Sequence, residues 1–175
     1  LIFEQLTLNY DNKNYSGFLG KFNPVVGLDY HNFPGMYGYQ AVEGYGIKER
    51  IGLGGIIRKH AGSFGTHELN LTAFAADTSG LSDSLFFQRS HNSKQDSGVS
   101  NTEDLSSYSA SLSGSYPFSF KDNAFSKELI YRVGYADQAA GISDATDNTR
   151  YSASLIYKNK ISEDLSGKFI FERMQ

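Results

Sequence analysis

Strict alternation of small polar residues with aromatic or apolar residues is the feature that most constrains how this chain folds. The stretch YSASLSGSY at 108–116 places a serine at every second position, and YSASLIY at 151–157 begins in the same way. Side chains of a β-strand point alternately to its two faces, so a period of two predicts strands with one apolar and one polar face. The pattern predicts a sheet whose two sides meet different surroundings.

Eight runs of this kind can be delimited, and they predict an all-β fold in a single domain that covers residues 1–175. Their expected bounds are 2–10, 15–23, 47–59, 66–76, 107–116, 128–137, 150–158 and 165–173. Several are as long as the ~9–11 residues of a tilted membrane strand, whereas strands of soluble proteins have ~5–6. Strand length therefore favours a sheet that crosses a lipid bilayer.

The connections between these runs alternate between short and long. The short ones are 11–14, 60–65, 118–127 and 159–164, which are polar and rich in turn residues, and the longer ones are 24–46, 77–106 and 138–149. A meander that crosses a membrane places alternate connections on opposite sides, and outer-membrane barrels have short turns on one side and long loops on the other. This sorting predicts an antiparallel up-and-down transmembrane β-barrel, with about eight strands in this chain.

Tyrosines stand at both ends of the apolar rows, for example Tyr108 and Tyr116 in one run and Tyr151 and Tyr157 in another. Such rings suit the boundary between membrane and water, although tyrosine is also a good strand former at the rim of a soluble sheet. The apolar rows include Ala and Gly, which bury little area in the core of a two-sheet protein. We therefore expect the apolar face to meet lipid and the serine face to meet the lumen of a barrel.

Charged residues of the predicted strands fall mainly on the serine side. The predicted pore-lining residues are Arg50, Arg58, Arg132, Arg150, Lys168, Glu68 and Glu172, and the segment 24–46 is expected to fold inward as a constriction loop that carries Tyr30, Phe33, Tyr37, Tyr39 and Tyr45. Basic residues outnumber acidic ones in the predicted lumen, although the chain has a formal net charge of -3. A mild preference for anions is expected, because charges that line a channel act on every passing ion.

Composition argues against several other classes of protein. No run approaches the ~18 apolar residues of a membrane helix, and the absence of cysteine removes disulfide scaffolds and thiolate metal sites. The 16 basic and 19 acidic residues form no basic stripe, so nucleic acid is not an expected partner. His31, His60, His67 and His91 lack the spacing of a metal site, and no pair of nucleophile and base is visible. We expect no catalytic residue, no metal and no cofactor.

The stretch GFLGKFNPVVGLDYHNFPGMYGYQ at 17–40, followed by IKERIGLGGIIR at 47–58, resembles Gram-negative outer-membrane porins, and some siderophore-uptake porins look similar. The likeness extends along the chain as strand rhythm and loop sorting, while its motifs are confined to 17–58. It implies a bacterial outer-membrane protein that contacts lipid and lipopolysaccharide, passes small hydrophilic solutes by passive diffusion and assembles, by analogy, as a homotrimer.

The two ends of the sequence depart from this family pattern. The opening Leu1-Ile2-Phe3 is too short for a signal peptide, and the ending FIFERMQ lacks the terminal aromatic residue that such barrels usually carry. The resemblance therefore implies either an internal part of a larger barrel, for instance half of one with about sixteen strands, or a chain that has been trimmed.

A second interpretation remains open at this point. In a soluble or surface-exposed β-sandwich, or a lipocalin-like binding module, the aromatic residues of 24–46 would line a ligand pocket. Such a module should stay monomeric in solution without detergent, whereas a channel segment should not.

Overall fold

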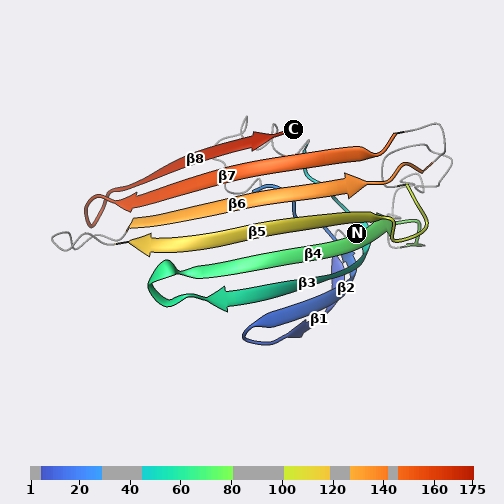
Figure 1. Ribbon diagram of the computed structural model, residues 1–175, viewed down its shortest axis with the longest axis horizontal. Helices are drawn as coiled ribbons and strands as arrows, with labels where there is room; N and C mark the ends of the chain where they lie inside the picture. The colour runs from blue at the N-terminus through green and yellow to red at the C-terminus, as the bar shows by residue number, and fades with distance from the viewer. Residues whose placement is uncertain (1–4, 29–44, 81–100, 119–126, 142–145) are drawn as a thin grey trace.

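The computed structural model describes residues 5–28, 45–80, 101–118, 127–141 and 146–175. Within these ranges lie β1 (Leu6–Asp11), β2 (Tyr15–Phe22), β3 (Arg50–His60), β4 (Thr66–Ala76), β5 (Ser107–Phe118), β6 (Lys127–Gln138), β7 (Asn148–Lys160) and β8 (Ser166–Met174). A short 3-10 turn, η2 (Gly62–Phe64), links β3 to β4. All eight predicted strands are present, with bounds within a few residues of those expected (Figure 1).

The strands form one sheet in which each pairs with its neighbours along the chain, in the order β1 to β8. Every pairing is antiparallel, from Leu6 with Lys21 in β1–β2 to Lys160 with Ser166 in β7–β8. This confirms the prediction of an all-β, antiparallel up-and-down arrangement. The sheet is open, with β1 and β8 as its two edges, and it does not close into a barrel.

Figure 1 shows the β1–β2, β3–β4 and β7–β8 turns at the left end of the sheet, whereas the chain leaves β2, β4 and β6 at the right end. Each turn is closed by a backbone hydrogen bond of 2.8 Å, in which Asn12, Ala61 or Ile161 donates its amide. In the β3–β4 turn Gly65 has φ 83°, and a Cβ there would lie 1.7 Å from the carbonyl oxygen of Ser115. Only glycine fits this position, so the sequence determines where that turn forms.

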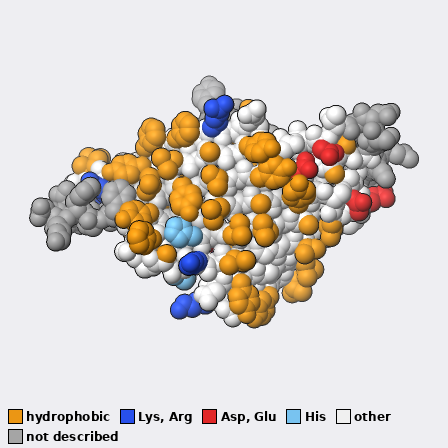
Figure 2. Space-filling model, viewed as in Figure 1, with side chains coloured by type: hydrophobic (Ala, Val, Ile, Leu, Met, Phe, Trp, Pro, Cys, Tyr) orange, Lys and Arg blue, Asp and Glu red, His pale blue; other side chains and the backbone are white. Residues whose placement is uncertain are grey.

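The register gives the sheet an apolar face and a polar face. The apolar face carries Leu8, Leu19, Leu53, Ile57, Leu69, Leu71, Tyr108, Leu112, Val133, Tyr151, Leu155, Phe169 and Phe171, all exposed. Leu19 pairs with Leu53, and Leu53 in turn pairs with Ala73, so these side chains form rows across the strands. Figure 2 looks onto this face and shows hydrophobic groups spread over it.

The polar face carries the serines of the alternating runs, and four of these side chains are buried. Ser109, Ser111, Ser152 and Ser154 are each less than a tenth exposed, and the hydroxyl groups of Thr72 and Ser109 lie 2.6 Å apart. The predicted division of β5 and β7 into a serine side and an apolar side is therefore confirmed.

A small hydrophobic core lies on the polar face, and sequence analysis did not predict it. It consists of Phe22, Val26, Ile47, Phe74 and Ala136, with Phe18 packed against it. Phe18 meets Phe22 edge to face at 4.9 Å, and it occupies the space beside Gly54, where a Cβ would lie 2.4 Å from its ring. Both phenylalanines of β2 therefore serve this core, whereas Leu19 between them lies on the apolar face.

A substitution of Phe74 tests whether this core stabilises the fold. Phe74 is fully buried, so Phe74→Ala should lower the free energy of unfolding by about 3–5 kcal/mol, the cost of a large cavity. Ile161→Ala, at an exposed position in the β7–β8 turn, should cost less than about 1 kcal/mol. Urea unfolding measures both, and equal losses would contradict this core.

Candidate functional site

Four of the seven predicted pore-lining residues lie in a single cross-strand row on the polar face. This charged row runs through Arg58, Glu68, Ser113, Arg132, Ser154 and Glu172, each in direct register with the next from β3 to β8. Direct register places neighbouring Cβ atoms about 5 Å apart, so charges within the row interact strongly with those beside them.

The β3–β4 part of the charged row is largely neutralised within the sheet. The guanidinium Nε of Arg58 lies 2.9 Å from a Glu68 carboxylate oxygen, and its Nη1 lies 3.8 Å from Asp11. Arg58 is thus flanked by two carboxylates, and this end of the row carries no excess of positive charge.

The β6–β8 part of the charged row holds a different partner, the main chain that follows β2. Arg132 Nη1 donates to the carbonyl oxygen of Gly27 at 2.9 Å. A Glu172 carboxylate oxygen accepts from the amide of Leu28 and from the hydroxyl of Ser154, both at 2.7 Å. These side chains therefore fasten the 26–28 backbone onto the polar face.

Two further contacts bring this backbone close to β6 and β7. The hydroxyl of Ser152 donates to the carbonyl oxygen of Val26 at 2.6 Å. A Cβ added to Gly134 would lie 1.9 Å from that same oxygen, so only glycine allows the approach. In Figure 1 the chain beyond β2 passes behind the sheet at β6 and β7, far across the sheet from the strand that it leaves.

The other described end of the same link also lies on the polar face. Arg150 Nη1 donates to the carbonyl oxygen of Tyr45, and Ile47 enters the core beside Val26. The amide of Glu49 donates to the Asn23 side chain at 2.8 Å, which joins the two ends of the link. We call residues 23–28 and 45–49 together the inner segment.

A buried cluster of ions fixes the inner segment to β2 and β4. Lys21 is fully buried, and its Nζ lies 2.8 Å from an Asp77 carboxylate oxygen and 3.0 Å from one of Glu49. Asp77 also accepts from the amide and the hydroxyl of Ser79. Removing one member of such a cluster would leave a buried charge without its counter-ion, which is strongly destabilising.

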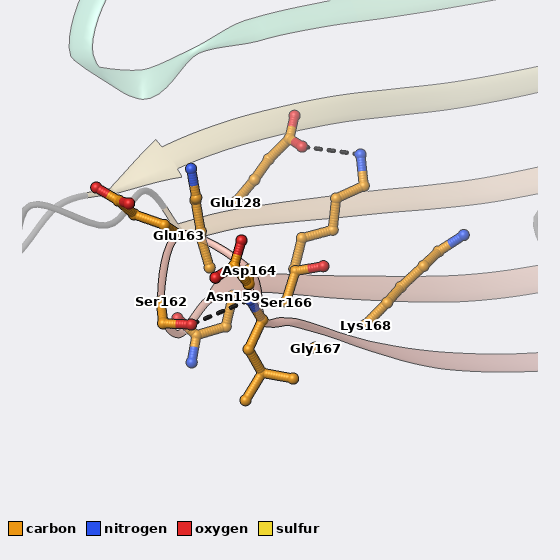
Figure 3. Close-up of a pocket in the computed structure, with 11 residues that line it drawn as sticks. Glu128, Asn159, Ser162, Glu163, Asp164, Ser166, Gly167 and Lys168 are labelled. Atoms are coloured by element: carbon orange, nitrogen blue, oxygen red, sulfur yellow. Dashed lines mark hydrogen bonds and ion pairs between the residues drawn. The ribbon is translucent and has the colours of Figure 1, made fainter.

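The other predicted pore-lining and constriction residues lie outside the charged row. Arg50 and Arg150 lie close enough to repel one another electrostatically. Lys168 lies at the turn end of β8, by a hollow of about 440 Å³ in which Lys158 and Glu128 form an ion pair at 3.0 Å (Figure 3). Tyr45 is half exposed. The other predicted constriction residues, Tyr30, Phe33, Tyr37 and Tyr39, lie outside the described residues.

A cavity of about 320 Å³ lies beside the inner segment. Val26, Leu28, Tyr45, Ile47 and Arg132 contribute to its lining, which is mostly apolar. No group of three or more His, Asp or Glu side chains able to hold a metal occurs in the part of the chain that the structure describes. The same ranges contain no helix that is long and apolar enough to cross a bilayer.

Aromatic rings gather near both ends of the apolar face. Close to the long connections, the ring of Tyr135 lies 5.9 Å from that of Tyr108 and 5.2 Å from that of Tyr151. At the turn end, Phe64 lies 6.4 Å from Tyr116. From Tyr108 to Tyr116 the strand rises about 27 Å, at about 3.4 Å per residue.

Sequence reasoning missed the residues that receive the inner segment. The alternating pattern places Gly134 and Ser152 on the polar face but indicates no partner for them, and no motif distinguishes Lys21. The signal that could have revealed the contact is the glycine itself, because a glycine inside a regular strand often marks the close approach of another backbone.

Compared with known protein families, curated proteins and solved structures, the chain shows no significant match.

The close contact between Gly134 and the backbone of Val26 can be tested directly. Gly134→Ala should displace residues 26–28, lower the free energy of unfolding by about 1–3 kcal/mol and speed tryptic cleavage after Lys48 several-fold. Gly17→Ala is the matched control, because the nearest atom to a Cβ there, the carbonyl oxygen of Gly54, is 3.8 Å away. The same cleavage rate in both variants would mean that the inner segment does not rest on Gly134.

Proposed function

We propose that this chain forms the wall of a porin-type channel in the bacterial outer membrane, through which small hydrophilic solutes diffuse passively. The observation that carries the proposal is the division of the sheet between a face of exposed hydrophobic side chains and a polar face that carries the serines. The exposed side chains extend from Leu8 on β1, 70% exposed, to Phe169 on β8, 61% exposed.

The size of the apolar face supports lipid as its surroundings. Eight strands spaced about 4.8 Å apart make a face about 34 Å wide. Soluble monomers rarely expose a continuous apolar patch larger than a few hundred Å², and a face of this width with the length of β5 exceeds that area. A lipid bilayer covers such a face without requiring bulky side chains at every position.

The aromatic residues at the ends of this face fit the same surroundings. With the tilt of about 40° usual in membrane barrels, the rise from Tyr108 to Tyr116 corresponds to a height of about 20 Å. This is close to the ~25 Å apolar band of outer-membrane barrels, whose borders carry aromatic girdles.

The polar face has the character of a channel lining. The Ser16 hydroxyl and the Asn70 carbonyl oxygen are buried there without a hydrogen-bond partner among the described residues. Buried polar groups nearly always have a hydrogen-bond partner, either in the protein or in ordered water, and water in a lumen could serve these two. The inner segment rests on the same face, so in a barrel it would narrow the passage.

A soluble binding module fits these observations less well. A β-sandwich needs a second sheet to cover one face, whereas all strands of the described ranges belong to one sheet. A lipocalin-like barrel encloses its ligand with the inner face of its sheet, and ligand pockets are lined mostly by apolar side chains. Here the face that the inner segment covers is the polar one.

The distribution of charge supports a mild preference for anions. Arg58 is balanced by Glu68, so the selective charges are those of Arg50, Arg132, Arg150 and Lys168 against Glu172. Solvated charges farther away than the ~8 Å screening length at physiological salt contribute little at a constriction. The local excess of arginine therefore outweighs the net negative charge of the chain.

The facing of the strands should appear in cysteine labelling, since the native chain contains no cysteine. In lipid vesicles, cysteines at Leu112 and Phe169 should react only with lipid-soluble reagents. Cysteines at the neighbouring Ser113 and Lys168 should react with aqueous reagents, because consecutive residues of a strand face opposite sides. Equal aqueous reactivity at all four positions would contradict a lipid-facing apolar surface.

Conductance tests the channel itself. In a planar bilayer the protein should form ohmic pores whose reversal potential under a salt gradient gives an anion-to-cation permeability ratio above 1. Arg132→Ala and Arg50→Ala should each bring this ratio closer to 1, and high salt should do the same. Lys13→Ala, which removes an equal charge from the exposed β1–β2 turn, is the control and should leave the ratio unchanged. Absence of pores would refute the proposed function.

A further inference from the structure

A lysine and a histidine lie side by side on the apolar face, close to the β3–β4 turn. Lys59 of β3 is in direct register with His67 of β4, and the next pair of residues on the same face is Ile57 with Leu69. Lys59 is exposed and forms no ion pair with another residue that the structure describes. On a face that lipid covers, an ammonium group extends to the membrane surface and needs an anion there.

His67 is held in place by a tyrosine two strands away. Its neighbour on β5 is Gly114, whose neighbour on β6 is Tyr131. The rings of His67 and Tyr131 meet above the glycine with centroids 6.0 Å apart, and His67 Nδ1 lies 2.9 Å from the tyrosine hydroxyl oxygen. A Cβ on Gly114 would lie 2.4 Å from that nitrogen. The absence of a side chain at Gly114 therefore allows this contact.

The contact with Tyr131 determines which nitrogen of His67 remains available as a donor. A hydroxyl group surrounded by lipid has no water to bond, so it donates to Nδ1, the acceptor that lies beside it. One nitrogen of a neutral imidazole accepts and the other carries the proton, so Nε2 keeps its hydrogen. A neutral His67 also does not repel the ammonium group of Lys59. Two adjacent strands thus present an ammonium group and an imidazole N–H group together.

The surroundings of this pair fit a phospholipid at the border of a bilayer. Toward the middle of the apolar face lie Leu69 and Leu112, which are in register and both exposed. At the turn end lie the rings of Phe64 and Tyr116, 6.4 Å apart. Aromatic residues border the apolar band of membrane barrels at the level of the headgroups. An acyl chain can follow the leucines while its phosphate group reaches the two donors.

Charge is distributed unevenly along the apolar face. Figure 2 shows acidic side chains toward the end of the long connections, and histidine and basic side chains mainly toward the end of the turns. From β3 to β6, the charged or imidazole side chains of this face are Lys59, His67 and Lys127 near the turns and Asp137 near the long connections. The turn end therefore favours an anion.

We propose that Lys59 and His67 bind the phosphate group of an anionic phospholipid, with Tyr131 as the residue that positions the histidine. This rests on the proposed function, because it requires lipid against the apolar face. A phosphate oxygen accepts from a charged donor in a short, strong hydrogen bond. The cationic group of a zwitterionic headgroup would lie near Lys59 and be repelled by it. The site therefore selects phosphatidylglycerol over phosphatidylcholine.

Tryptophan quenching measures which lipid occupies the site, because the chain has no tryptophan of its own. Leu112→Trp places a reporter in register with Leu69, beside the site, and Tyr151→Trp places another near the long connections. The protein is inserted into phosphatidylcholine vesicles that contain a small fraction of one brominated lipid. At position 112 the association constant of brominated phosphatidylglycerol should exceed that of brominated phosphatidylcholine about five-fold, the order expected of one basic side chain beside an anionic lipid. At position 151 the two constants should be equal.

Substitutions in the Leu112→Trp protein identify the residues that bind the headgroup. Lys59→Gln and His67→Leu should each bring the ratio of the two constants close to 1. Tyr131→Phe should lower the ratio while quenching by phosphatidylcholine stays the same, which separates lost positioning of the histidine from a change in the sheet. Lys13→Gln, which removes an equal charge from the exposed β1–β2 turn, is the matched control and should leave the ratio unchanged. An unchanged ratio in both Lys59→Gln and His67→Leu would overturn the site.

The same measurements separate this site from the proposed function. Excess inorganic phosphate should leave the ratio unchanged, because the acyl chains keep the lipid at the apolar face; loss of the ratio would show that a free anion is the occupant and overturn the lipid site. Equal quenching by both lipids at both reporters would overturn the headgroup site and leave the channel proposal standing. If no lipid quenches either reporter, the apolar face does not meet lipid and both proposals fail. A clear preference for phosphatidylglycerol without conductance would refute the channel alone.

Discussion

The antiparallel register from β3 to β8 is the constraint on which the rest of the structure depends. Side chains alternate between faces with a period of two, so a slip of one residue in any pair would move every side chain of that strand to the other face. Leu112, for example, pairs with Leu69 on one side and Val133 on the other. The same register aligns Arg132 with Ser154 and Glu172, and thereby creates the place where the inner segment binds.

The strands could be predicted because their signal is local. YSASLSGSY identifies its two faces within nine residues, and the β3–β4 turn is marked by glycines that the turn itself requires. The inner segment could not be predicted to the same extent. Its contacts join Val26 to Ser152 and Leu28 to Glu172, which are far apart in the sequence. Such contacts depend on how the whole sheet curves, and no single stretch of sequence records them.

The charged residues illustrate the same limit. Period two correctly places Arg58, Glu68, Arg132 and Glu172 on one face, but it treats them as equivalent lining residues. In the structure Arg58 and Glu68 pair with each other, whereas Arg132 and Glu172 hold backbone groups of the inner segment. A charge that is bonded to a fixed backbone remains in one position, so its field has a constant direction at the place it occupies.

The inner segment is both a part of the core and a part of the candidate channel lining, and this limits how it can move. Val26 and Ile47, one near each end, pack with Phe22 and Phe74. Lifting the segment would expose these side chains and would separate Glu49 from the buried Lys21. Both changes oppose opening, through the loss of apolar burial and through an incompletely compensated charge. The ends of the segment are therefore expected to stay in place, and in the proposed channel they would form a fixed narrowing.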